Sequence, residues 1–152
     1  MGFIASEIMS GHHEFADRGG PSEQLPFAFR VDWGPERLRD WLNPSHPGFL
    51  WQELEGEVQV GGLCGWTPCR GTLHLEYVPK RRIRYDFDFE VDGVVYRYVG
   101  DKKNIRLWNL AVSHTTCFGV LTERETGKLV STSVSFFHLR HLPMLATLRW
   151  RR

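Results

Sequence analysis

The chain has 152 residues, of which 41% are hydrophobic and 13% aromatic, a composition typical of a folded protein with one substantial core. Nineteen basic and eighteen acidic residues leave a formal net charge of +1. Because the charges are nearly balanced, there is no electrostatic reason to expect nucleic acid or an anionic membrane surface as a partner.

Two regions of different character divide the chain at residue 24. Residues 1–24 are polar and glycine-rich, which predicts a flexible N-terminal lead-in. Residues 25–152 are predicted to form a single β-barrel domain. It opens with LPFAFRVDW (25–33), whose alternating apolar residues predict a strand. Leu38, Trp41 and Leu42 then follow Pro35 at helical spacing, so we expect one short early helix.

Alternation with a period of two returns after this helix. It marks strands over 53–60, 72–78 and 105–112, and a hairpin of 114–123 with 128–138. GGLCGWTPC (61–69) reads as a loop by composition, and the segment from residue 139 onward is more helix-like.

The segment RIRYDFDFEVDGVVYRYVG (82–100) gives the clearest prediction. Its odd positions up to Val91 are apolar and its even positions are charged, and Asp92-Gly93 is a type I′ hairpin signal. This turn fixes the register of the two strands. It places Val91 opposite Val94, Phe89 opposite Tyr96, Phe87 opposite Tyr98, and Asp88 opposite Arg97.

About eight consecutive strands with short turns predict an all-β fold. The expected architecture is an antiparallel up-and-down eight-stranded barrel, calycin- or lipocalin-like, with a β-sandwich as the alternative. Such a barrel is either filled by its own side chains or holds one small ligand.

Signatures of metal and nucleotide sites are missing from the sequence. It contains no HExxH, CxxC, GxSxG, P-loop or GxGxxG motif, so we expect neither a metal nor a cofactor. Cys64, Cys69 and Cys117 are an odd set, and neither a signal peptide nor a long apolar run is evident. These features favour a cytoplasmic location with free thiols over a Cys64–Cys69 disulfide.

The aromatic face of the 82–100 hairpin favours binding of a small lipophilic ligand, sterol-, terpenoid- or fatty-acid-like. Aromatic walls supply apolar contact, and a few polar groups at the barrel mouth fix orientation. The expected ligand-binding residues are Phe87, Phe89, Tyr96, Tyr98, Trp108, Lys102 and Thr116.

Two other functions fit the same pattern. The first is an isomerase or cyclase in which His114, Tyr96 or Tyr98 transfers a proton or polarises a carbonyl. His114 and Thr116 share one face of the predicted strand 114–123, and this face is either inside the barrel or part of a polar rim. The second is a fully packed docking module, which predicts an exposed apolar patch.

A family resemblance extends over residues 25–150. The segments FAFRVDW, LRDWL, GEVQVGGLCGWTPCRGTLHL, YRYVGDKKNIRLW, SHTTCFGVL and STSVSFFHLRHLPMLATLR carry it. The chain resembles an accessory, non-flavin domain attached to bacterial FAD-dependent glucose–methanol–choline oxidoreductases that are similar to cholesterol oxidase. The resemblance implies an FAD-dependent oxidoreductase as partner and a lipophilic alcohol nearby. Its matching positions are Trp41, Gly56, Val58, Gly61, Gly62, Gly100, Lys102, Trp108, Thr115 and Thr116.

Overall fold

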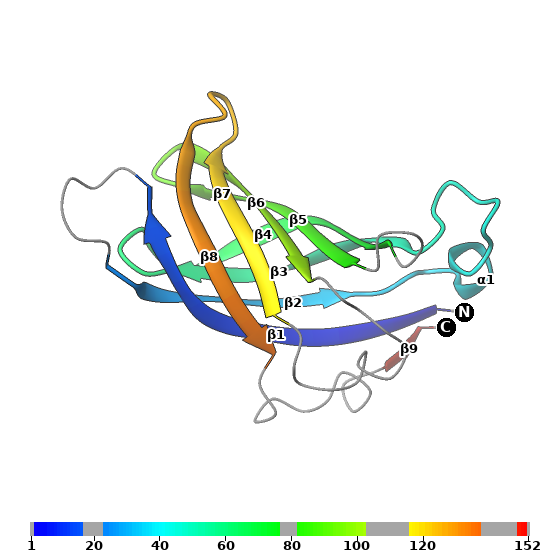
Figure 1. The fold of residues 1–152 in the computed structure, drawn as a ribbon. Coiled ribbons are helices and arrows are strands. Elements are labelled where there is room, and N and C mark those ends of the chain that lie inside the picture. Colours follow the sequence, from blue (N-terminus) through cyan, green and yellow to red (C-terminus); the bar gives the residue numbers. More distant parts are fainter. Residues whose placement is uncertain (1, 17–22, 77–81, 103–115, 138–148, 152) are drawn as a thin grey trace.

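The computed structural model describes residues 2–16, 23–76, 82–102, 116–137 and 149–151. These residues form strands and one helix of four residues (Figure 1). The elements are β1 (Gly2–Phe15), β2 (Leu25–Trp33), α1 (Leu38–Trp41), β3 (Trp51–Val60), β4 (Cys64–Glu76), β5 (Arg82–Val91), β6 (Val94–Lys102), β7 (Thr116–Glu123), β8 (Leu129–Phe137) and β9 (Arg149–Arg151).

The strands close into the predicted antiparallel eight-stranded barrel. Strands β2 to β8 pair with their sequence neighbours in order. Strand β1 pairs with both β8 and β2, which closes the sheet, and β9 adds to the first residues of β1. The fold class, with its one short early helix, is therefore confirmed, and the sandwich alternative is wrong. Helix α1, β9 and the start of β1 lie at the same end of the barrel (Figure 1), called here the α1 end.

Two sequence-based boundaries need correction, and one predicted strand is not among the described residues. The lead-in prediction is wrong for Gly2–Phe15, which forms β1, so the barrel begins at residue 2 and not at residue 25. The predicted loop 61–69 is wrong from Cys64 onward, where β4 already begins. The predicted strand at 105–112 lies outside the described residues. Strand β1 thus supplies one of the eight strands of the barrel.

The β5–β6 hairpin has the register that its turn predicts. Asp92 and Gly93 have φ values of 50° and 81°, the left-handed pair that a type I′ turn requires. All four predicted residue pairs lie opposite one another. The side chain of Arg97, however, binds Asp86 with Nη2–Oδ2 at 2.6 Å, while Asp88 pairs with Arg124. The backbone register was predictable, but the choice of ion partner was not.

Aromatic rings fill the barrel around this hairpin. The centroid of Phe87 lies 4.8 Å from that of Tyr98 and 5.5 Å from that of Phe29, and all three side chains are buried. Tyr98 fits because Gly119 lies against its ring: a Cβ at Gly119 would stand 2.3 Å from Tyr98 Cε2. In this part of the barrel the aromatic face therefore encloses other side chains at close packing.

Candidate functional site

A buried ion pair lies inside the barrel next to the aromatic rings. Glu7 on β1 accepts a hydrogen bond from the Lys102 ammonium through Oε1. Its other oxygen, Oε2, accepts from the Tyr85 hydroxyl at 2.7 Å and from the Trp33 indole at 3.3 Å. The side chains of Glu7 and Lys102 are only 4% and 6% exposed. We call Glu7, Lys102, Tyr85 and Trp33 the Glu7 cluster.

Strand lengths place the Glu7 cluster toward the α1 end. Strand β8 ends at Phe137, which lies opposite Met9, so Glu7 lies beyond the last β8 pair. Lys102 is the last residue of β6, and Trp33 is the last residue of β2 before the segment that leads to α1. The cluster therefore lies toward the ends of β2 and β6 that are nearest to α1.

Burial dominates the electrostatics of the Glu7 cluster. Transfer of two charges out of water costs several kcal/mol each, so an apolar replacement often serves stability equally well. Burial, reinforced by the nearby Glu7 carboxylate, raises the pKa of Tyr85 well above its usual value. Tyr85 therefore remains a hydrogen-bond donor throughout the physiological pH range.

A cleft of about 530 Å³ lies beside the cluster, between the segment around α1 and the start of β3. Trp33, Trp41 and Trp51 line it. Trp33 belongs to both features, since it lines the cleft and donates its indole N–H to Glu7. Trp41 is fixed by an edge-on contact with Phe3, with centroids 5.6 Å apart. The cleft and the Glu7 cluster thus have Trp33 in common.

Charged groups surround this cleft unevenly. Five carboxylates and two guanidinium groups line it, an excess of three negative charges among the described residues. Arg70 lies 3.6 Å from Glu55, so one charge of each sign is paired. The carboxylates are those of Asp32, Glu36, Asp40, Glu53 and Glu55, and the guanidinium groups are those of Arg37 and Arg70.

One buried amide group also lines the cleft. Gln52 Oε1 accepts a hydrogen bond from Trp41 Nε1 at 2.5 Å, which fixes the orientation of the amide. Its Nε2 is buried and has no hydrogen-bond partner among the described residues. A buried donor left without an acceptor costs about 1–3 kcal/mol. The Gln52 amide is thus a buried polar group of which only the oxygen has a hydrogen-bond partner among the described residues.

Some of the predicted ligand-binding residues do face the barrel interior. Phe87, Phe89 and Tyr98 are buried, and Tyr96 stacks on Phe89 with centroids 5.5 Å apart. They pack against one another, so their role in ligand contact stays a prediction. Predicted residues Trp108 and His114 lie outside the described residues.

Two predicted positions differ in the structure. Lys102, expected near the barrel mouth, is buried against Glu7. Thr116, expected to contact ligand, shares the outward face of β7 with the exposed Phe118, while its neighbour Cys117 faces inward opposite Lys102. The parity of β7 is therefore opposite to the one that a ligand contact by Thr116 requires.

Tyr98 and Cys117 form an enclosed contact. Tyr98 Oη and Cys117 Sγ lie 3.4 Å apart. Burial raises the pKa of Tyr98 well above its usual value and the pKa of the Cys117 thiol to about 11. Both groups therefore stay protonated at neutral pH, which favours a packing role over the proton transfer predicted for Tyr98. The three cysteines are free thiols.

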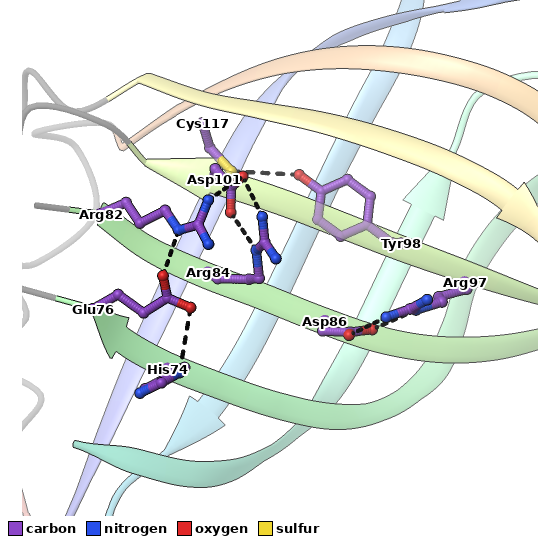
Figure 2. A network of polar contacts seen from close by, with 9 residues as sticks. All are labelled: His74, Glu76, Arg82, Arg84, Asp86, Arg97, Tyr98, Asp101 and Cys117. Carbon is purple, nitrogen blue, oxygen red and sulfur yellow. Dashed lines mark hydrogen bonds and ion pairs between the residues drawn. The ribbon is translucent and has the colours of Figure 1, made fainter. Parts of the chain in front are cut away.

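The outer face of β4, β5 and β6 carries a chain of ion pairs (Figure 2). Arg82 Nε lies 2.6 Å from Glu76, and Arg84 binds Asp101 through two hydrogen bonds of 2.8 and 3.0 Å. His74 Nδ1 lies 3.4 Å from Glu76. The two arginine pairs join β5 to β4 and to β6, so they reinforce the strand register.

The outer face of β7 and β8 is apolar by contrast. Phe118, Val120 and Phe136 are exposed there, and Phe118 lies opposite Val134. A hollow of about 620 Å³ is lined by Phe118, Val120 and Val134 together with residues of β1, β5 and β6. We call Phe118, Val120, Val134 and Phe136 the outer apolar face. An exposed apolar patch is the feature that the docking alternative predicts.

Comparison with known proteins identifies no relative. No family model matches the chain, and searches of curated proteins and of solved structures also find no match. The fold thus defines the class by itself: a closed antiparallel eight-stranded barrel with a buried aromatic cluster. In the described part of the chain, no group of three or more His, Cys, Asp or Glu side chains is arranged to hold a metal ion. None of the helices found there is long and apolar enough to cross a membrane.

Proposed function

We propose that this barrel binds a small lipophilic ligand at its α1 end. The observation that carries the proposal is the position of Trp33, which lines the cleft and donates its indole N–H to Glu7. A ligand seated in the cleft lies one side chain away from a buried set of polar groups. Ligand sites of this kind combine apolar walls with a few polar groups that fix orientation.

The cleft dimensions and chemistry suit a compact ligand. A volume of about 530 Å³ falls within the usual range for small-molecule sites. The three tryptophans supply apolar contact, worth about 25 cal/mol per Å² buried before the cost of binding. Because carboxylates outnumber guanidinium groups at the cleft, we favour a sterol- or terpenoid-like body over a fatty acid.

Replacement of Trp51 by alanine is expected to weaken binding about tenfold, because the variant loses one aromatic wall of the cleft. Isothermal titration calorimetry with progesterone, borneol and decanoate measures the change. Trp66→Ala is the matched control, since Trp66 is 40% exposed, close to the 42% of Trp51, and lies outside the cleft. Equal affinities for the two variants, or no binding by the unmodified protein, would count against this site.

The outer apolar face supports a second proposal, the docking of an FAD-dependent oxidoreductase. The exposure of Phe118 and Val120 favours a protein contact there. We expect flavin absorbance to co-elute with the tagged protein from its native lysate and to disappear with Phe118→Ser. Leu129→Ser, an exposed apolar position outside this face, should retain it. Absence of flavin from the unmodified sample would contradict the proposal.

A further inference from the structure

We propose that residues 36–49, which include α1, form a lid over the α1-end cleft, with Leu50 as its strained hinge. This inference rests on the proposed function, because it states how the same cleft admits and retains its ligand. The segment projects from the end of the barrel (Figure 1). It supplies one wall of the cleft, with Arg37, Trp41 and His46 among its residues, and strands β1–β4 supply the other. The position of the segment therefore sets the width of the cleft.

Little buried surface holds this segment against the barrel. The structure describes all of residues 34–50, and within them only Pro35 is buried; α1 itself has no buried residue. A helix of four residues makes too few backbone hydrogen bonds to be stable alone, so its position depends on packing. Elements with few buried contacts are the ones that open locally while the rest of a protein stays folded.

Trp41 holds the segment in its closed position. Its Nε1 donates to Gln52 Oε1 at 2.5 Å, and its ring meets Phe3 edge-on, with centroids 5.6 Å apart. Leu38, one helical turn earlier, also packs against the core. The chain just before the lid is fixed, because a Cβ at Gly34 would stand 1.9 Å from the carbonyl oxygen of Phe3. An opening motion is therefore expected to turn chiefly about the end that leads into β3.

That end of the segment is strained at Leu50. Its φ is 53°, in the left-handed region that a bulky side chain rarely adopts. Asp92 shares this conformation, but it occupies a type I′ turn that requires it. Backbone hydrogen bonds hold Leu50 in place, from its N–H to Trp41 O at 3.0 Å and from Leu75 N–H to its own carbonyl at 2.8 Å. Strained residues of this kind are typical of ligand clamps and switch regions.

Gln52 gives a second reason for opening. In the closed position its amide is buried, with Oε1 bound by Trp41 and Nε2 without a partner among the described residues. Departure of Trp41 would let water reach the amide and satisfy it. Strain at Leu50 and the unsatisfied Nε2 thus favour opening, whereas the packing of Trp41 favours closure. A ligand that contacts both walls of the cleft binds the closed state better and shifts the equilibrium toward it.

Solvent exchange of the Trp41 indole proton measures opening without a ligand, because its hydrogen bond to Gln52 protects it while the lid is closed. Leu50→Gly and Leu50→Asn both accept a left-handed backbone, so each should slow this exchange about fivefold in proton–nitrogen NMR spectra. Leu42→Gly is the matched control: it lies in the same segment at a φ of −89° and should not slow the exchange. The Trp33 indole proton, bound to Glu7 inside the barrel, should keep its rate in all three variants. Unchanged or faster exchange at Trp41 in both Leu50 variants would overturn the lid.

Borneol tests whether the lid closes on a ligand. At ten times its dissociation constant, it should slow exchange of the Trp41 indole proton about tenfold, since it binds the closed state. Calorimetric binding of borneol without this slowing would overturn the lid while the binding function stands. Failure of progesterone, borneol and decanoate alike to bind, with the effects of the Leu50 variants intact, would overturn the binding function and retain the lid.

Discussion

Replacement of Glu7 by leucine is expected to lower the free energy of unfolding by about 3–5 kcal/mol. The change leaves the buried Lys102 ammonium without the Glu7 carboxylate and removes the acceptor shared by Tyr85 and Trp33. Because these groups lie inside the barrel, water does not replace the lost contacts without opening the structure. Urea denaturation at neutral pH, followed by tryptophan fluorescence, measures the loss.

Two further variants make this prediction specific to the ion pair. Glu7→Leu combined with Lys102→Met removes both charges and should recover most of the lost stability, since a well-packed apolar pair often matches a buried ion pair. Glu57→Gln breaks the exposed Arg30–Glu57 pair of 3.1 Å and should cost at most about 1 kcal/mol. If Glu7→Leu lowers the free energy of unfolding no more than Glu57→Gln does, the Glu7 cluster is not buried as the structure has it.

Gly71→Ala is the second substitution with a large expected effect, a loss of about 2–3 kcal/mol. Gly71 lies on β4 opposite Phe87 of β5. A Cβ at this position would stand 1.9 Å from the carbonyl oxygen of Asp86 and 2.5 Å from the Cα of Phe87. Both are backbone atoms, so the β4–β5 pair must separate to admit the methyl group. Thermal and urea unfolding report the loss.

The same strand provides the control for this substitution. Gly65 also lies on β4, but a Cβ there meets no atom within 4 Å. Gly65→Ala should therefore change the free energy of unfolding by no more than about 0.5 kcal/mol. Equal effects at the two glycines would show that β4 and β5 do not approach as closely as the structure has them.

The sequence predicted the fold where alternation and turn chemistry agree. Asp92-Gly93 set the hairpin register, and the apolar positions of β2, β3 and β5 face inward as expected. These signals are local, since a two-residue turn and a period of two are visible within about ten residues. The expected strands did not include β1, however, and closure of the barrel depends on the pairing of β1 with both β2 and β8.

The Glu7 cluster could not be predicted in the same way. The inward face of β1 carries Ala5, Glu7, Gly11 and His13, whose small and polar side chains hide the alternation that marks a strand. The partners of Glu7 are also distant in sequence, with Tyr85 78 and Lys102 95 residues away. Only barrel closure brings β1 against β5 and β6. The sequence shows that these polar residues exist, but it does not show that they meet inside the barrel.

The predicted role of Thr116 failed for a related reason. A strand of alternating residues defines two faces, yet the sequence of β7 does not say which face is inside. Phe118 and Val120 are large and apolar and lie outside, while Cys117 and Gly119 lie inside beside Tyr98. The bulky Tyr98 ring requires small neighbours, so packing from another strand decided the parity.

Fluorine NMR of protein labelled with 5-fluorotryptophan tests the central claim most directly, because the tryptophans report from separate places. Titration with borneol should shift the resonances of Trp33, Trp41 and Trp51, which line the cleft. The resonances of Trp66 and Trp150, which are exposed outside it, should stay in place. Single Trp→Phe variants assign the signals. Binding that leaves the three cleft resonances unmoved would contradict a ligand site at the α1 end of the barrel.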